Sequence, residues 1–170
     1  MKRLGFNSKL LLCLLMLCAR PFGAARAQES IDIGAEVWIE PGQTPEQIDG
    51  WFSFAANNGM RSVRLFLMWN YIEKQPGEFD FSLYDTAFAA ANRHKVRIEA
   101  TLCAIHGPAW LSEKFRGRPQ FNELFDSEQV LVRAAEYIRQ TVTRYRDDQA
   151  LESWWVLNEP RRFDPRSPLA

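Results

Sequence analysis

The sequence is poor in cysteine and histidine, and this scarcity argues against two kinds of site. Of its three cysteines, Cys13 and Cys18 lie close to the N-terminus and Cys103 stands alone. If the N-terminal segment is removed, no internal disulfide can form, and the apolar neighbours of Cys103 predict that it packs as a small hydrophobe. The two histidines, His94 and His106, lack the spacing of metal ligands, so we expect no metal site and no cofactor.

Long hydrophobic runs are missing as well. The apolar stretch Leu10–Ala19 has ten residues, whereas a helix that spans a bilayer needs about 20. Basic residues precede this stretch, and Ala25-Arg26-Ala27 follows it with the small residues of a cleavage site. We therefore predict that residues 1–27 are a signal peptide cut after Ala27. The protein would then be secreted or periplasmic, without a stable membrane anchor.

A concentrated basic patch is also absent. The first 27 residues hold five of the 21 basic residues and none of the 21 acidic ones, so the processed chain carries 16 against 21, a formal charge of −5. Nucleic-acid binding relies on clustered Lys and Arg, so we expect no nucleic-acid partner. The arginines of residues 161–170 are predicted to belong to a solvated, truncated tail.

What the sequence does contain is a regular alternation of strand and helix patterns. Apolar runs predict strands at 31–39, 62–68, 96–102 and 151–157. Helical spacing and end signals predict helices from Thr44 to about Asn57, from Ser82 to about His94, and over Ser127–Tyr145. The segments 69–81, with a turn at Pro76-Gly77, and 103–126 are predicted loops. Trp51, Trp154 and the helix phenylalanines are predicted to pack in the core.

Four such units imply a parallel sheet, either doubly wound or the first half of a (β/α)8 barrel. A doubly wound nucleotide fold usually carries Gly-x-Gly-x-x-Gly after its first strand, and this chain does not. Polar and aromatic residues gather instead where strands end, as in a barrel's catalytic face; they are Glu36, Trp38, Trp69, Asn70, His106, Asn158 and Glu159. We favour half a barrel over residues 28–160, because a complete one needs about 250 residues. The outer strands of such a half barrel have unpaired backbone groups, so self-association through these edges is possible.

Glu159 is the leading candidate for chemistry. It closes the apolar run 154–157, and a carboxyl at the mouth of a buried strand is partly desolvated, which raises its pKa and suits it to proton donation. Asn158 offers an amide beside it, and Pro160 ends the strand. A surface ion pair between Glu159 and the arginines that follow is the equally weighted alternative. No Gly-x-Ser-x-Gly motif supports a serine nucleophile.

Several segments together resemble the clan A glycoside hydrolases, most closely the family 42 β-galactosidases. They are Gly34-Ala35-Glu36, Val63-Arg64-Leu65, Trp69, Ile72-Glu73, Pro76-Gly77-Glu78-Phe79-Asp80-Phe81, Leu83, Asp85, Gly107-Pro108-Ala109-Trp110-Leu111 and Asn158-Glu159-Pro160. The resemblance covers about residues 31–160. The Pro-Gly-Glu-Phe-Asp-Phe segment and the Asn-Glu-Pro ending are specific when they occur together.

The resemblance implies an exported retaining glycosidase that acts on an oligosaccharide or polysaccharide. Glu159 matches the acid/base, Asn158 matches the residue that contacts the sugar 2-hydroxyl, and Arg64 matches an arginine that supports the carboxylates. The family's nucleophile is a glutamate on the seventh strand, and no residue of this chain takes that role. A truncated, non-catalytic or merely sugar-binding fragment is therefore the main alternative.

Two departures from family 42 concern the substrate. Leu157 stands where that family tends to have aspartate, and Trp155-x-x-Asn158-Glu159-Pro160 is also at home in family 5 β-glycanases. His106-Gly107 replaces the small residues and proline that family 42 often has there. A family 5-like endo-β-glycanase is thus a further alternative.

The remaining candidates, apart from Glu36, each have two readings. Arg64 is either a support for catalytic carboxylates or a structural ion-pair partner. Glu36 is a candidate ligand for a sugar hydroxyl. Trp69, with Trp38 and Trp110, could stack on a sugar or fill the core. His106 could bind substrate or brace its loop.

Overall fold

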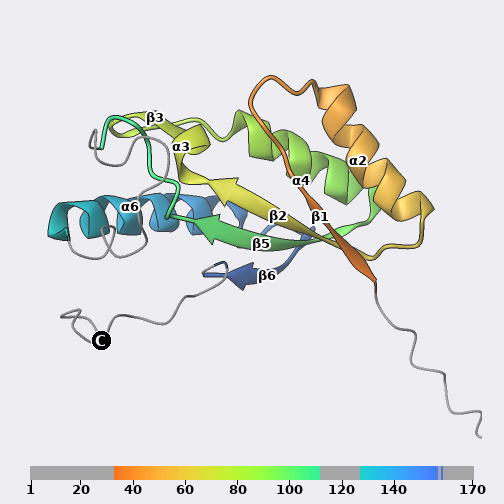
Figure 1. The fold of residues 1–170 in the computed structure, drawn as a ribbon. Helices are drawn as coiled ribbons and strands as arrows, with labels where there is room; N and C mark the ends of the chain where they lie inside the picture. The colour runs from red at the N-terminus through yellow and green to blue at the C-terminus, as the bar shows by residue number, and fades with distance from the viewer. Residues whose placement is uncertain (1–32, 112–126, 157, 159–170) are drawn as a thin grey trace, which may run out of the picture. The chain divides into compact units, whose positions relative to one another are not determined.

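The computed structural model describes residues 33–111, 127–156 and 158. Its main feature is one parallel sheet of four strands: β1 (Gly34–Val37), β2 (Ser62–Met68), β5 (Arg97–Cys103) and β6 (Leu151–Trp155). The strands lie side by side in chain order, and each is parallel to its neighbour (Figure 1). A doubly wound nucleotide-binding sheet reverses its strand order at a switch point, whereas a barrel adds strands in one direction. The predicted partial barrel is confirmed.

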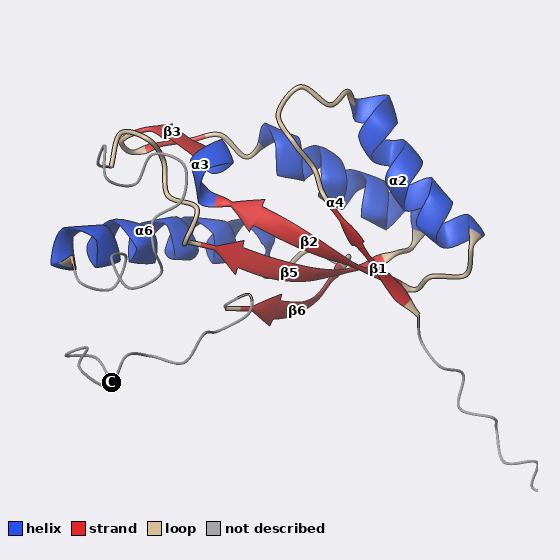
Figure 2. Cartoon of the chain, viewed as in Figure 1, coloured by secondary structure: helices blue, strands red, loops and turns tan. Residues whose placement is uncertain are grey.

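All three long helices pack against the same face of the sheet. They are α2 (Pro45–Asn57), α4 (Ser82–His94) and α6 (Glu128–Tyr145). Their apolar residues share one buried cluster with alternate strand residues, among them Val63, Leu65, Leu67, Ile98, Ala100 and Leu102. Because alternate residues of a strand project from one face, the helices form one layer and the strands the other (Figure 2). The opposite face of the sheet carries none of these helices.

The ends of the helices follow the local signals in the sequence. Thr44 caps α2: its side chain accepts a hydrogen bond from the Gln47 backbone N–H at 3.3 Å, and the Gln47 side chain accepts one from the Thr44 N–H at 2.9 Å. This reciprocal pair satisfies two donors that the first turn leaves free. Ser127 caps α6 in the same position. The predicted helix limits are thereby confirmed, whereas β6 ends two residues earlier than we predicted.

The segment 69–81 is not the simple loop that its sequence predicts. It contains the short helix α3 (Trp69–Ile72) and an antiparallel hairpin of β3 (Glu73–Gln75) and β4 (Glu78–Phe79). The predicted turn is present, with Gly77 at a φ of +82°, where a Cβ would be strained. Strands of two or three residues are too short to show an alternating pattern, so the prediction of a loop was wrong for the residues around that turn.

Two aromatic residues of α2 also differ from the prediction. Trp51 is 49% exposed and Phe54 is 59% exposed, whereas Phe52 is fully buried. Successive residues of a helix are about 100° apart, and the face of α2 that meets the sheet is centred on Ile48, Phe52 and Ala55. Trp51 and Phe54 point away from that face, so their predicted core role is wrong.

The exposed large apolar side chains are distributed unevenly over the described residues. Four of the seven precede β2, namely Ile33, Trp38, Trp51 and Phe54. The other three are Val132 of α6, Trp155 of β6 and Val156, which follows β6. The intervening elements, from β2 through β5, contribute none. Since β1 and β6 are the two outer strands of the sheet, apolar surface is exposed in the units that flank its open edges.

Candidate functional site

The helix-free face of the sheet carries a row of polar side chains in register. Glu36 of β1 lies opposite Arg64 of β2, and Arg64 lies opposite Glu99 of β5. Two residues further along, Thr101 of β5 lies opposite Trp155 of β6. Residues in such register on parallel strands project from the same face. The structure therefore places two predicted site residues, Glu36 and Arg64, on one surface.

Arg64 is the centre of this surface. Its Nε donates a hydrogen bond to Thr101 Oγ1 at 2.9 Å, and its Nη2 donates one to Asn158 Oδ1 at 2.9 Å. Its guanidinium carbon lies 4.5 Å from the ring centroid of Trp155 and 4.9 Å from that of Phe66. Hydrogen bonds fix the edge of the guanidinium and aromatic rings cover its faces. Two predicted site residues from distant parts of the chain are thus in direct contact.

The orientation of the Asn158 amide follows from this contact. A guanidinium has donors and no acceptor, so the amide oxygen is the atom that faces Arg64. The amide nitrogen, a donor, is then turned toward other groups and can serve a hydroxyl of a ligand. Glu159, the predicted acid, is the next residue of the chain and lies outside the described residues. Its role remains a prediction.

Two exposed indoles flank Arg64. Trp38 donates from Nε1 to Glu36 Oε1 at 2.6 Å and stacks on Phe66, with ring centroids 4.7 Å apart. On the other side, Trp155 donates from Nε1 to Glu99 Oε2 at 3.1 Å. Trp38 is 51% exposed and Trp155 is 44% exposed. Each ring is held by a strand carboxylate and still offers a flat apolar surface to a ligand.

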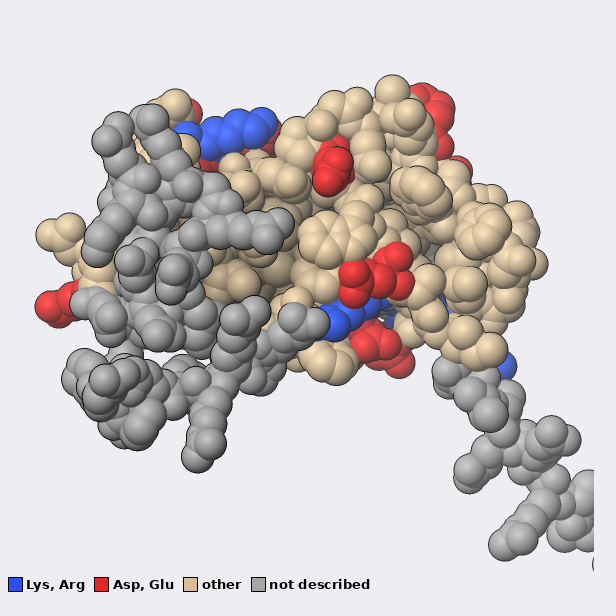
Figure 3. All heavy atoms as spheres, viewed as in Figure 1, with Lys and Arg blue, Asp and Glu red and all other residues tan. Residues whose placement is uncertain are grey.

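Charges of both signs meet on the sheet surface. In Figure 3, a basic group near the middle of the view lies between two acidic ones. Such mixed polar groups beside aromatic rings suit a neutral ligand rich in hydroxyl groups better than a polyanion, which would require clustered cations.

Cys103 lies on the same face but is not suited to act as a nucleophile. It is buried with Phe66 and Met68, as we predicted for a small hydrophobe. Burial raises the pKa of its thiol to about 12. Because the thiolate is the reactive form of cysteine, this side chain is inert at neutral pH.

Trp69 lies on the other face of the sheet from the Arg64 cluster, and His106 lies in a turn. Trp69 has no exposed surface: it belongs to the core on the helix side, where it stacks on Tyr137 with centroids 5.6 Å apart. Of its two readings, burial favours core packing. His106 lies in the turn after β5, where its carbonyl accepts a hydrogen bond from the Asn70 N–H at 2.9 Å and its own N–H donates to Cys103 O at 3.2 Å. These are backbone contacts, so both readings of the His106 side chain remain predictions.

Sequence reasoning missed two tyrosines that hold the strand ends in place. The hydroxyl of Tyr84 accepts a hydrogen bond from the Met68 N–H at 2.8 Å. The hydroxyl of Tyr137 donates to Leu67 O at 2.5 Å and accepts from the Cys103 N–H at 3.3 Å. Burial raises the pKa of both hydroxyls. The available signal was that a tyrosine on a buried helix face needs a hydrogen-bond partner.

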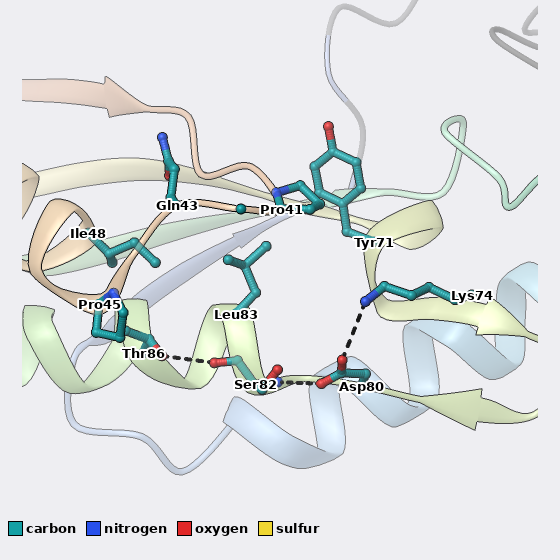
Figure 4. Close-up of a pocket in the computed structure, with 11 residues that line it drawn as sticks. Pro41, Gln43, Pro45, Ile48, Tyr71, Lys74, Asp80, Ser82, Leu83 and Thr86 are labelled. Atoms are coloured by element: carbon teal, nitrogen blue, oxygen red, sulfur yellow. Dashed lines mark hydrogen bonds and ion pairs between the residues drawn. The ribbon is translucent and has the colours of Figure 1, made fainter.

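A separate cavity of about 270 Å³ lies between the loop after β1, the β3–β4 hairpin and the start of α4. Figure 4 shows Lys74 reaching toward Asp80 across one side of it, with an ion-pair distance of 3.5 Å. Asp80 also accepts from the Ser82 N–H at 3.0 Å, and the Thr86 hydroxyl donates to Ser82 O at 2.9 Å. Its charged groups are therefore already paired, and we assign it no ligand.

Residues 33–111, 127–156 and 158 contain no group of three or more His, Cys, Asp or Glu side chains placed to hold a metal ion. In the same residues, no helix has the length and apolar character needed to cross a membrane.

No family model and no curated protein matches the sequence. Solved structures do match the fold. The β-galactosidase from the psychrophilic Marinomonas ef1 superposes with a TM-score of 0.61 and 18% identity, over 73% of this chain and 21% of that one. The β-galactosidase from the Antarctic haloarchaeon Halorubrum lacusprofundi gives 0.60 and 20%, over 72% and 20%. The endo-β-1,4-mannanase from Thermotoga petrophila gives 0.61 and 16%, over 77% and 35%.

The fold is a partial (β/α)8 barrel. Its structural neighbours are glycoside hydrolases of the kinds that the sequence resembles, namely β-galactosidases and a β-mannanase. At such low identity the likeness establishes the fold alone. The chain spans about a fifth to a third of the length of these neighbours.

Proposed function

We propose that this chain carries the sugar-contacting and proton-donating part of a retaining β-glycoside hydrolase of the β-galactosidase-like type. The observation that carries the proposal is the hydrogen bond between Arg64 and Asn158 on the helix-free face. It holds a side-chain amide at the sheet's C-terminal edge, immediately before Glu159 in the sequence. An amide can donate a hydrogen bond to a hydroxyl of the substrate, and an acid beside it can donate a proton to the glycosidic oxygen.

The proposed chemistry assigns each group a step. Glu159, protonated, gives its proton to the glycosidic oxygen as the bond from that oxygen to the sugar's anomeric carbon breaks, and the leaving group departs as an alcohol. A carboxylate nucleophile, a role for which we propose no residue of the given sequence, bonds to the anomeric carbon. Glu159, now ionised, then takes a proton from the water that displaces the nucleophile. In retaining enzymes the two carboxyls stand about 5–5.5 Å apart.

The described residues would bind the sugar rather than react with it. The Asn158 amide nitrogen faces the 2-hydroxyl, and Arg64 keeps that amide oriented. Glu36 is placed to accept from another hydroxyl, although its carboxylate already accepts from Trp38. Trp38 and Trp155 provide exposed indole faces for the apolar side of a sugar ring.

A family 5-like β-glycanase is the second candidate. The endo-β-1,4-mannanase superposes with a TM-score of 0.61, the same value as the Marinomonas β-galactosidase. Binding measured against a panel of β-galactosides and β-mannosides separates the two candidates, because the preferred sugar should bind at the lowest concentration.

A binding experiment on the 170-residue protein tests the proposal. We expect β-glycosides to shift the indole NMR signals of Trp38 and Trp155, and Asn158→Ala to weaken binding by about tenfold, the effect of one lost hydrogen bond of about 1.4 kcal/mol. Asn57→Ala, at an exposed asparagine bonded to Ser53, is the matched control and should leave binding unchanged. Equal binding by wild type and Asn158→Ala would contradict the proposal.

Catalysis and export have their own tests. Without a nucleophile, the protein should release no nitrophenol from nitrophenyl β-glycosides, which is also what the reading as a non-catalytic fragment expects. Turnover that Glu159→Gln abolishes would point instead to a site completed by another chain, through the open sheet edges.

For export, N-terminal sequencing of the processed protein should begin at Gln28.

A further inference from the structure

Glu73 is a buried charge that the proposed mechanism does not use. It opens β3 and has 0% exposed surface. Carboxylates are almost never fully buried unless they are paired. Glu73 accepts hydrogen bonds from Trp69 Nε1 at 2.7 Å and from the Gly77 N–H at 2.7 Å, and it forms an ion pair with Arg133 of α6. A single carboxylate thus joins α3, the hairpin turn and α6.

The loop that follows β5 is attached to the same residue. Trp110 donates from Nε1 to the backbone carbonyl of Glu73 at 3.0 Å. The guanidinium carbon of Arg133 lies 5.3 Å from the centroid of a Trp110 ring, so the cation that pairs with Glu73 also covers this indole. Both the edge and the face of Trp110 are therefore held by Glu73 or by its partner.

A third contact ties the middle of the loop to Trp69. A Cβ built on Gly107 would lie 3.5 Å from two carbons of the Trp69 ring, which is ordinary van der Waals contact. The backbone at Gly107 therefore lies close over an indole whose N–H is bonded to Glu73. Three attachments of the loop thus lead to Glu73: Trp110 bonds its backbone carbonyl and lies against its partner Arg133, and the indole below Gly107 bonds its carboxylate. The Asn70 N–H to His106 O hydrogen bond is a separate attachment.

We propose that Glu73 is a positioning residue that fixes the loop 104–111 at the C-terminal edge of the sheet. This loop carries His106 and follows directly from β5, the strand that provides Thr101 to Arg64. Its relevance to saccharides rests on the proposed function, whereas the attachment itself does not. Glu73 acts through Trp69, Trp110 and Arg133 and touches no substrate.

Hydrogen exchange of the full chain tests the proposal. Glu73→Gln keeps an acceptor for Trp69 but removes the charge that pairs with Arg133. We expect amide exchange in residues 106–111 to accelerate at least about tenfold, while the protected amides of β2 and β5 change less than about twofold. The near-UV circular dichroism of the indoles should fall as well, because Trp110 loses its fixed environment.

Two more variants keep the test decisive. Trp110→Phe keeps an aromatic ring but removes the indole N–H that bonds the backbone carbonyl of Glu73, so it should loosen the same residues by a smaller factor even if Glu73→Gln unfolds. Adding Arg133→Met to Glu73→Gln also removes the cation that covers Trp110, so the double variant should exchange at least as fast in this loop as Glu73→Gln alone.

The matched control breaks a different ion pair between helices. Asp85→Asn weakens the pair of Asp85 with Arg144, which joins α4 to α6, and should not accelerate exchange in 106–111 selectively. If Glu73→Gln accelerates exchange equally throughout the sheet, or leaves the loop unchanged, the proposal is overturned. No saccharide is used, so this result is independent of the binding experiment.

Discussion

Replacing Arg64 with methionine tests the organisation of the helix-free face most directly. Methionine keeps an apolar stem of similar length and removes every donor. The hydroxyl of Thr101, which is fully buried, then loses the hydrogen bond from Arg64 Nε. Asn158 also loses its partner, but it is only partly buried, so water can replace the guanidinium there.

The expected cost follows from these contacts. A buried polar atom left without a partner costs about 1–3 kcal/mol, and each cation–π contact at a partly exposed site contributes about 0.5–1 kcal/mol. Arg64 lies over two rings, those of Phe66 and Trp155. We expect Arg64→Met to lower the free energy of unfolding by roughly 2–5 kcal/mol, measured by urea denaturation and far-UV circular dichroism.

A double-mutant cycle isolates the buried hydrogen bond. Thr101→Val should cost about 1 kcal/mol in the wild-type background, because it removes the acceptor of Arg64 Nε. In the Arg64→Met background the same change removes an unsatisfied hydroxyl and should be neutral or stabilising. The coupling energy should therefore be about 1–2 kcal/mol. Arg139→Met, at an exposed ion pair within one helix, is the control: its cost should simply add to that of Thr101→Val, without coupling. Additive single costs would refute the reasoning.

Two further predictions concern the scaffold. A Cβ at Gly34 would lie 2.8 Å from Ser62 Oγ, so Gly34→Ala should destabilise the fold by about 1–2 kcal/mol in urea denaturation. Gly50 lies in α2 with open space at the position of a Cβ, so Gly50→Ala should instead stabilise the fold by about 0.5–1 kcal/mol. Hydrogen bonding, first of all to Arg139, lowers the pKa of Glu136 from 4.5 to about 2. The stability that Glu136 contributes is present above pH 4.5 and is lost as the pH falls toward 2, so Glu136→Gln should show a shallower acid-induced loss of stability than wild type over that range.

The sequence predicts the framework well where the signal is local. The limits of β2 and α4 follow from an apolar run and from a helical repeat that begins at Ser82. The capping box at Thr44 can be recognised from four consecutive residues of the sequence. The contact between Arg64 and Asn158 was not predicted, because Arg64 is the third of the seven residues of β2 and does not lie at the C-terminal end of that strand.

The sequence does not predict contacts that depend on strand register or on the rotation of a helix about its axis. Nothing near Thr101 in the sequence identifies it as the partner of Arg64, which is 37 positions away. Glu73 and Arg133 are 60 positions apart, and their pairing requires α6 to be placed over the hairpin. Trp51 repeats at a helical interval that fits a core, but the face of α2 that packs on the sheet excludes it. Tertiary packing decides these cases, and local patterns do not encode it.

The helix-free face of the described sheet has a consequence for acidity. Trp38 and Trp155 are about half exposed, so water reaches both indoles beside Arg64. A carboxylic acid that stays protonated near neutral pH needs a desolvated environment. The desolvation that keeps such an acid protonated would have to be supplied by whatever encloses this surface. Ligand recognition and proton donation would then be separable properties. The first would depend on the side chains of these four strands, and the second on the desolvation of the acid.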